Sequence, residues 1–477
     1  MKRLFIICTM LLSFGAYSQN IEWGQEYEPG DKSSIYNYIG SIGDDHYFSY
    51  GYQTTGFIRR FNRIGFMSVN NNNVKSYAEQ YVDIPLYSII SSFTTNNDIA
   101  VIYSQENKDK ETNEVKCVLI DKTTYAEKSD NVLLSYNHSK KDDPKINIYS
   151  SNDKSKYVIT YMNVNSKTKQ GYFMVNVFDK DLNKLWTNRY TTDIEGSIKI
   201  LNISPTNDGE VYILSELDSD NPKLILSKVN ENEVTEKIVS DKLEFDDTKL
   251  HVINNNTVFI GDNSKGKFTG ITFDFEKSEI TNTVSFEYIK EKGTYWNLKD
   301  IYPLDNGNLV AIVEDAYLQI FEGSNSAATY TYYNRCFYAL CVNPNEGNLV
   351  YNQLLSKATR TYNRYRIDKG QFESPLFFTK GNDFYAIYNA DKGDNDLCGD
   401  VFIETNITFP KGGKDVVTNI LKISPQGTPT QKTLFTQKET KSIFSPNISF
   451  EEKIGEIIIG RFVDGDILNF GTMQLTE

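Results

Sequence analysis

A short phrase that recurs along the whole chain limits what this sequence can fold into. The phrase is a polar turn followed by alternating aromatic and aliphatic residues, as in residues 207–215, Asn-Asp-Gly-Glu-Val-Tyr-Ile-Leu-Ser. Repetition at intervals of about 50 to 75 residues indicates a repeat architecture. The eight copies are His46–Tyr50, Asp98–Tyr103, Lys156–Tyr161, Glu210–Leu214, Thr257–Gly261, Asn308–Val313, Asp383–Tyr388 and Glu456–Gly460.

Each copy is accompanied by further strand-like runs. In the fourth unit, Ser197–Leu201 precedes the copy and Lys223–Val229 follows it. In the third unit, Leu185–Tyr190 follows a polar turn and completes a set of four. Four short antiparallel strands repeated every 40 to 60 residues, roughly, are typical of a β-propeller. Several runs are apolar on both faces, as blades covered by a neighbour on each side require.

The two ends of the sequence indicate how such a ring closes. The last unit offers three strand-like runs and stops one strand short. Residues 21–28 resemble the fourth-strand pattern around Trp186 and have no partner of their own. We therefore predict an all-β propeller of eight four-stranded blades, with residues 21–28 as the outer strand of the last blade. Seven blades are the alternative if the first unit is incomplete, and a pair of β-sandwiches is the third interpretation.

The first 18 residues have the pattern of a signal peptide. Lys2 and Arg3 precede the apolar run Leu4–Phe14, and Ala16-Tyr17-Ser18 is a small-x-small cleavage site before Gln19. The run is shorter than the roughly 20 residues of a membrane span. We expect an exported, soluble protein. Because no linker rich in Pro, Gly or Ser divides residues 19–477, we assign them to one propeller domain.

The charge balance disfavours two classes of partner. The net charge is −13 at pH 7, and removal of the signal peptide, which holds two basic residues and no acid, changes it to −15. Such a chain repels nucleic acid and anionic lipid. We therefore expect neither as a partner.

Four cysteines remain in the mature chain: Cys117, Cys336, Cys341 and Cys398. An oxidising compartment permits up to two disulfides among them. Cys336 and Cys341 are five residues apart in one strand-like run, so their side chains point to opposite faces and do not pair with each other. Buried free thiols are the interpretation that we favour for most of them.

Several phrases resemble those of a known group of proteins. These are the signal end Ala16–Gln19, the blade phrase Val177–Trp186 and the run Phe377–Asn389. They are similar to exported β-propeller-like repeat proteins of the Bacteroidota cell envelope. The resemblance covers most of the chain. It implies an envelope or secreted protein and assigns no functional residue.

Two insertions interrupt the repeat. One is Gly323–Asn334 in the sixth unit, and the other spans about Ala390 to Asp415 in the seventh. Insertions on a repeat scaffold form loops on one face, which is often the binding face. The asparagine run at residues 70–73 is predicted to be a turn.

The most distinctive candidate binding patch follows the sixth unit. It alternates arginine and tyrosine, a combination that suits carboxylates, sugars or a protein partner. The alternative is a strand whose arginine stems cover neighbouring aromatic rings. The residues are Arg360, Tyr362, Arg364, Tyr365 and Arg366.

Metal and cofactor chemistry has little support. Asp394, Asp396 and Asp400 lie in an acidic loop that suits calcium, but the EF-hand spacing is not met and a solvated turn is favoured. The three histidines, His46, His138 and His251, are scattered, so we interpret them as hydrogen-bonded or solvated side chains. No cofactor is expected other than a structural calcium ion.

The sequence favours a binding protein over an enzyme. No phosphate loop, nucleophile elbow or Cys-x-x-Cys pair occurs, and the adjacent acids Glu314 and Asp315 are weak candidates for catalysis at a channel mouth. The leading hypothesis is a non-catalytic scaffold of the cell envelope, periplasmic, outer-membrane-associated or extracellular, that presents a loop face to a protein or glycan. The alternatives are a glycosidase or lyase, and an obligate subunit of an outer-membrane or secretion assembly.

Overall fold

The computed structural model describes residues 21–475 with internal gaps. The residues that it leaves undescribed between these ends are 30–34, 54–61, 79–81, 83, 85–87, 108, 110–111, 138–145, 165–170, 191–196, 219–222, 241–244, 246, 265, 289–294, 322–328, 364–373, 392–404, 407–415 and 465–466.

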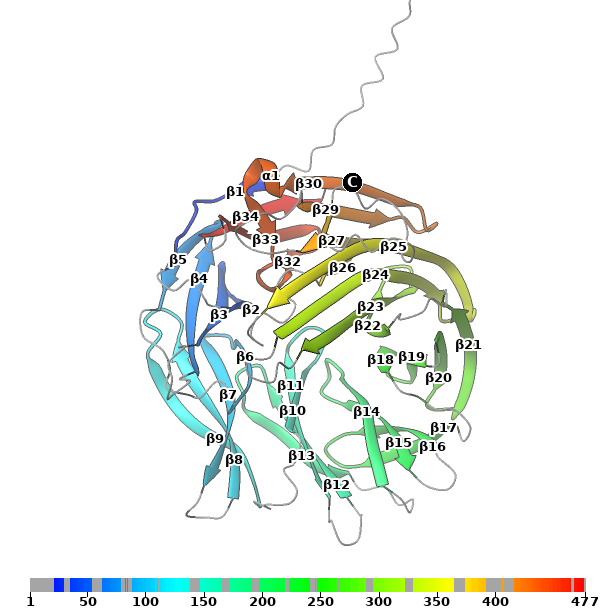
Figure 1. The fold of residues 1–477 in the computed structure, drawn as a ribbon. Coiled ribbons are helices and arrows are strands. Elements are labelled where there is room, and N and C mark those ends of the chain that lie inside the picture. Colours follow the sequence, from blue (N-terminus) through cyan, green and yellow to red (C-terminus); the bar gives the residue numbers. More distant parts are fainter. Residues whose placement is uncertain are drawn as a thin grey trace, which may run out of the picture.

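The described chain forms a ring of eight antiparallel sheets, each of which is one blade of a β-propeller (Figure 1). In most blades, four consecutive strands run from the centre of the ring to its rim. The predicted fold class and blade count are confirmed. The seven-blade alternative is wrong because the first unit forms a complete four-stranded sheet.

The strands of blades one to four follow one another in the chain. In that order they are β2 (Ile35–Ile42), β3 (Asp45–Gln53), β4 (Asn62–Asn70), β5 (Asn73–Tyr77); β6 (Ile89–Thr94), β7 (Asp98–Asn107), β8 (Thr112–Asp121), β9 (Glu127–Asn137); β10 (Ile146–Ser150), β11 (Lys156–Val164), β12 (Gly171–Asp179), β13 (Lys184–Tyr190); and β14 (Ser197–Pro205), β15 (Val211–Asp218), β16 (Lys223–Val229), β17 (Val234–Ser240).

Blades five and seven also have four strands each, whereas a strand is added to blade six and the first strand of blade eight is divided. Their elements are β18 (Thr248–Asn254), β19 (Thr257–Ser264), β20 (Lys267–Asp274), β21 (Glu279–Glu287); β22 (Trp296–Pro303), β23 (Leu309–Phe321), β24 (Thr329–Asn343), β25 (Asn348–Asn363) with β28 (Thr405–Asn406); β26 (Leu376–Lys380), β27 (Asp383–Asp391), β29 (Val416–Ile423), β30 (Pro429–Thr436); and α1 (Gln437–Thr440), β31 (Ser442–Phe444), η2 (Pro446–Ile448), β32 (Phe450–Lys453), β33 (Glu456–Val463), β34 (Ile467–Gln474) and β1 (Ile21–Trp23).

The recurring phrase forms the second strand of every blade. These strands are apolar on both faces because each blade is covered by a neighbour on either side. In β15, Val211, Tyr212, Ile213 and Leu214 are all 0% exposed. Hydrophobic clusters fill the spaces between successive blades, as between blades four and five. Within the described residues, no helix has the length and hydrophobicity that a bilayer span requires.

The ring closes as predicted. β1 pairs antiparallel with β34, with Trp23 opposite Gly471. The pairing continues to Tyr27, which exchanges two 2.8 Å backbone hydrogen bonds with Leu468. Residues 21–28 thus complete blade eight from the N-terminal side, and neither end of the ring lacks its outer strand.

The turn between β4 and β5 fastens this closing strand to blade one. Asn71 and Asn72 have φ values of 46° and 64°, as a type I′ turn requires. The Asn72 amide donates to the Glu22 carbonyl oxygen over 2.8 Å and accepts from the Thr472 hydroxyl over 2.8 Å. A Cβ on Gly24 would lie 2.0 Å from the Asn72 carbonyl oxygen. The predicted asparagine turn is therefore also a contact between the first and last blades.

A buried cation holds the closing strand from within blade eight. The guanidinium carbon of Arg461 lies 3.6 Å from the centre of the Trp23 ring, and Arg461 Nε donates to the Asn469 side chain over 2.8 Å. Asn469 in turn donates to the Gly24 carbonyl oxygen over 3.0 Å. Burial lowers the pKa of Arg461 to about 10, so the side chain stays charged at neutral pH.

The two faces of the ring carry different connections. On one face, which we call the hairpin face, the first strand of each blade turns into the second and the third into the fourth. On the other, the insertion face, the second strand connects to the third and successive blades are joined. Both predicted insertions connect a second strand to a third, β23 to β24 and β27 to β29. They therefore leave the ring on the same face, as expected.

The first insertion is more ordered than the predicted loop. β24 begins at Thr329, because alternating Thr and Tyr residues favour a strand over a loop. We call residues 316–321, 329–334 and 359–363 the blade-six extension; here β23, β24 and β25 continue as one paired sheet. β28, from the second insertion, pairs in parallel with its outer strand. In the view of Figure 1, β24 and β25 reach across the middle of the ring.

The cysteines divide into two kinds. Cys117 and Cys341 are buried free thiols, as favoured. Cys336 is disulfide-bonded, so it departs from that interpretation. Cys336 and Cys341 are not joined to each other, which confirms the argument from strand geometry. Cys8 and Cys398 lie outside the described residues.

Candidate functional site

A single-residue bulge marks the innermost strand of several blades. The strand register shifts by one residue in blades one, two, four, five and six. In the first four of these blades the extra residue is aliphatic and packs, half-buried, against the core between blades. The extra residues, in chain order, are Ile39, Ile90, Leu201, Ile253 and Lys299. Blade six therefore places a lysine where the four other bulged blades place an aliphatic side chain.

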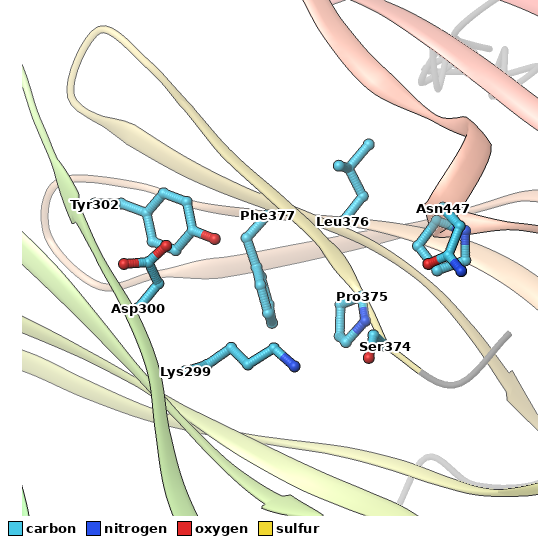
Figure 2. A pocket seen from close by; sticks show the side chains of 9 residues that line it. Lys299, Asp300, Tyr302, Ser374, Pro375, Leu376, Phe377 and Asn447 are labelled. Carbon is cyan, nitrogen blue, oxygen red and sulfur yellow. The ribbon is translucent and has the colours of Figure 1, made fainter. Parts of the chain in front are cut away.

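A pocket with a cavity volume of about 350 Å³ lies beside this bulge. Its walls come from the inner elements of blades six, seven and eight (Figure 2). Figure 2 shows Lys299 extending from β22 toward Pro375, with Asp300 beside Tyr302 and Asn447 on the other side. The lining residues are Lys299, Asp300, Tyr302, Ser374, Pro375, Leu376, Phe377, Pro446 and Asn447.

The wall from blade eight depends on an interruption of its first strand. Between β31 and β32 the chain leaves the sheet and forms η2, which brings Pro446 and Asn447 to the pocket. Gly460 on β33 makes room for this turn, since a Cβ there would lie 2.4 Å from Ile448 Cγ1. The Ser449 hydroxyl accepts from the Gly460 amide over 2.8 Å, which replaces a strand-to-strand hydrogen bond. The pocket therefore exists because two inner strands depart from regular pairing.

The charges at the pocket are arranged in layers. Lys299 and Asp300 are exposed, whereas Glu314 on β23 lies behind them and its side chain is 2% exposed. Lys299 Nζ is 3.6 Å from Glu314 Oε2, and Glu314 Oε1 has no hydrogen-bond partner. Asp300 Oδ1 accepts from the Ile301 amide over 2.9 Å. An incompletely bonded buried carboxylate thus faces a partly exposed ammonium group.

Aromatic rings form the apolar part of the wall. The Phe377 ring packs edge-on against Phe337, with centroids 5.3 Å apart, and lies 6.1 Å from Tyr302. Burial raises the pKa of the Tyr302 phenol, and the carboxylates of Asp300 and Glu314 raise it further. Tyr302 is therefore protonated at neutral pH and offers a hydroxyl donor. The pocket can hold a ligand with an apolar face and several hydroxyl or amide groups.

A second polar group links blade one to blade eight on the hairpin face. His46 Nδ1 lies 2.9 Å from the Ser41 hydroxyl oxygen, and Nε2 lies 3.4 Å from Glu452. The imidazole is buried against the Phe450 ring, with centroids 4.9 Å apart. Burial lowers the pKa of His46, and the nearby acids oppose this shift. The expectation of a hydrogen-bonded histidine is confirmed here.

The arginine–tyrosine patch falls partly within the described chain. Arg360 and Tyr362 lie on β25 in the blade-six extension, opposite Tyr333 and Thr331. Arg360 also pairs with Asn406 of β28 through the backbone. Arg364, Tyr365 and Arg366 lie outside the described residues, so the patch stays a prediction.

The remaining candidates from the sequence are the calcium loop and the adjacent acids Glu314 and Asp315. Asp394, Asp396 and Asp400 lie outside the described residues, and the calcium prediction stays untested. In the part of the chain that the structure describes, no three His, Cys, Asp or Glu side chains are placed to hold a metal ion. Glu314 is in the second strand beside the pocket, and Asp315 accepts a 2.7 Å hydrogen bond from the Tyr295 amide.

Sequence reasoning missed Lys299, Asp300 and the rest of the pocket. An alignment of the inner strands carries the signal: Ile200-Leu201-Asn202-Ile203 in blade four corresponds to Leu298-Lys299-Asp300-Ile301 in blade six. The lysine in place of leucine is visible only once the bulges are superposed. The recurring phrase lies on the second strand of each blade, so it carries no information on the inner strand.

Comparison with known proteins identifies no family. No family model and no curated protein sequence matches the chain. Among solved structures, the chain is similar to the Dos1 propeller, with 10% identity, 95% of each chain covered and a TM-score of 0.45. It is similar to Saccharomyces cerevisiae Sqt1, with 10% identity, 96% of this chain and 99% of that chain covered, and a TM-score of 0.45. It is also similar to the WD40 domain of SCAP from fission yeast, with 9% identity, coverage of 95% and 96%, and a TM-score of 0.38.

Proposed function

We propose that this chain is an exported, non-catalytic binding propeller of the cell envelope that presents its insertion face to a protein or glycan partner. The observation that carries the proposal is that the segments added to the four-stranded blades all belong to one face. Both insertions, the blade-six extension and β28 belong to that face, whereas the hairpin face consists of short turns. Binding residues on a rigid scaffold are commonly held in the segments that connect its regular strands.

Export is supported by two independent features. The first 18 residues have a signal-peptide pattern. Cys336 is disulfide-bonded, and disulfides persist in oxidising compartments such as the periplasm or the cell exterior. The resemblance to Bacteroidota envelope proteins points the same way. We therefore place the protein in the periplasm, at the outer membrane or outside the cell.

A binding role fits the pocket better than glycoside hydrolysis does. Hydrolysis uses two carboxylates about 5 to 10 Å apart across the sugar. Of the described residues that line the pocket, Asp300 is the one carboxylate, and the Glu314 side chain behind it is 2% exposed.

An affinity capture from the native envelope tests the proposal. The bait is the mature protein, and the key variant replaces residues 317–333 by Asn-Gly, which closes the hairpin where Ala316 and Asn334 already pair. The matched control is Ile454→Ser, at an 81% exposed position on the hairpin face. We expect the wild type and the control to recover one partner and the shortened variant to lose it. Equal recovery by all three baits contradicts the role of the insertion face, and recovery of neither a protein nor a glycan contradicts the binding function.

A further inference from the structure

We propose that the pocket between blades six, seven and eight binds an uncharged saccharide unit, which hydrogen-bonds to Lys299 and Asp300 and rests against the apolar wall. The inference deepens the proposed binding function and rests on it. It is carried by the departure of blade six from the other blades, by the incomplete bonding of Glu314, and by the charge and shape of the pocket.

The first argument comes from the bulge. Bulges re-aim side chains and are typical of functional positions in sheets. Blade four has Leu201 and Asn202 where blade six has Lys299 and Asp300. Leu201 packs against the core between blades, whereas Lys299 and Asp300 are exposed and line the pocket. Blade six thus lacks the apolar contact that Leu201 makes in blade four, and it places two opposite charges in the pocket instead.

The second argument comes from the buried carboxylate. Glu314 Oε1 is buried without a hydrogen-bond partner, a state that costs about 1 to 3 kcal/mol or more for a charged group. Lys299 Nζ, at 3.6 Å from Oε2, is beyond ordinary hydrogen-bond distance. Glu314 therefore holds the ammonium group near the pocket without saturating its three donors. A ligand oxygen can accept from Lys299 while the ion pair remains in place.

The charge balance selects an uncharged ligand. Glu314 and Asp300 together outnumber Lys299 by one negative charge, in a chain whose net charge is −13. An anion would meet this field unfavourably, and a cation would compete with Lys299 for the same carboxylates. A hydroxyl group both donates and accepts. Neighbouring sugar hydroxyls can therefore donate to Asp300 and accept from Lys299 together.

The shape of the pocket agrees with a sugar ring. Pro375, Leu376 and Pro446 provide apolar surface, and Asn447 and Ser374 lie near them as further hydrogen-bonding groups. The cavity volume of about 350 Å³ is near the lower end of the range for ligand sites, about 300 to 1,000 Å³. It suits one sugar unit better than an extended peptide. Ser374 and Pro375 precede β26, so this part of the pocket lies toward the insertion face.

Binding of methyl glycosides to the mature protein tests the inference. The probes are the methyl glycosides of glucose, galactose, mannose and N-acetylglucosamine, with glucuronic acid and glucosamine as charged controls, measured by saturation-transfer NMR and calorimetry. The variants Lys299→Leu and Asp300→Asn reproduce the blade-four residues and should therefore fold. The matched control is Lys199→Leu, since Lys199 Nζ lies 3.6 Å from Glu216 in blade four, away from the pocket.

We expect at least one uncharged glycoside to bind, and each pocket variant to weaken that binding about 10-fold, the effect of losing one hydrogen bond to a charged group. The Lys199→Leu control should bind as the wild type does. The inference is overturned if no uncharged glycoside binds, if a charged control binds more tightly, or if the pocket variants retain full affinity. Recovery of an envelope protein partner together with absent glycoside binding would reject this inference and leave the proposed function standing.

Discussion

Asn72 contributes to ring closure through both its backbone and its side chain. Its φ of 64° lies in the left-handed region, where asparagine is tolerated better than most residues. Its side chain bonds to Glu22 and Thr472 across the boundary between the first and last blades. Asn71, beside it, has a φ of 46° and serves the turn. Two adjacent residues of one type therefore have different energetic roles.

Substitution of these asparagines should separate the two roles. We expect Asn72→Ala to lower the free energy of unfolding by about 2 to 4 kcal/mol, from two hydrogen bonds and the left-handed backbone. Asn72→Gly keeps the backbone conformation and should cost about 1 to 2 kcal/mol. The control Asn71→Gly should change stability by less than about 0.5 kcal/mol. Urea denaturation measures all three, and equal values for Asn72→Gly and Asn71→Gly would contradict the role of the side chain.

The histidines His46 and His251 should make stability depend on pH. Burial lowers the pKa of each below the ordinary value of 6.5, although Glu452 opposes the shift at His46 and Asp300 opposes it at His251. The unfolded chain therefore binds more protons than the folded chain at mildly acidic pH, and stability falls as the pH drops through about 6.5. The stabilising effect of the neutral imidazoles is fully present above that pH.

The double variant His46→Gln, His251→Gln should flatten this dependence. We expect the difference in unfolding free energy between wild type and variant to shrink as the pH is lowered from about 7.5 to 5.5. Denaturation at several pH values measures it. Because both proteins share every carboxylate, the difference isolates the histidines, and parallel profiles would show that neither histidine titrates differently on folding.

Among the elements, the closing strand β1 joins the two ends of the ring. It is 3 residues long, yet it carries Trp23, which stacks on the Arg461 guanidinium, and its backbone continues to the bridge at Tyr27. β1 stabilises the ring by more than its own backbone hydrogen bonds provide. It also covers the outer edge of β34 and contacts the asparagine turn of blade one.

Removal of the closing strand should destabilise the ring strongly. We expect a protein that begins at Pro29 to lose on the order of 5 kcal/mol of unfolding free energy relative to one that begins at Gln19, from the half-buried Trp23 and the lost pairing. A protein that begins at Ile21 is the control and should match the longer form. Guanidinium denaturation and limited proteolysis compare the three. Equal stability of all three would mean that the ring holds without this strand.

The sequence predicted the second strand of each blade but not the irregularities of the inner strands. The second strands were recognisable because strict alternation and a preceding turn are local properties of the sequence. The bulge at Lys299 and the excursion at η2 were not, because each depends on how a strand pairs with its neighbour. One extra residue re-aims the side chains around it. The pocket is built from those two irregularities.

At the level of the whole molecule, the buried free cysteines indicate whether the ring is folded, and the disulfide-bonded cysteine indicates an oxidising compartment. Cys117 and Cys341 are buried in blades two and six, and burial raises the pKa of both thiols to about 12. Both are therefore protonated and shielded in the native ring. Cys336, on the same strand as Cys341, is already disulfide-bonded.

Thiol labelling of the mature protein without reductant should reflect this division. We expect no reaction of Cys117 and Cys341 with a thiol reagent near pH 8 in the native state, and reaction of these two free thiols after denaturation. Cys336 should react only after reduction. Peptide mapping identifies the labelled residues. Labelling of Cys336 without reductant would show that its disulfide does not form in the purified protein and would weaken the argument for export.

The sequence by itself predicted the propeller, a count of eight blades with seven as the alternative, and the closing strand. These follow from a hairpin phrase repeated eight times, from an N-terminal strand without a partner of its own and from a last unit that is one strand short. All three patterns can be recognised in the sequence without knowledge of tertiary contacts. Only the tertiary structure decided which inner-strand residues face a pocket. Residues 299–302, 374–377 and 446–447 meet there from three blades, and their meeting depends on bulges and on a glycine-accommodated turn that no periodicity in the chain reveals.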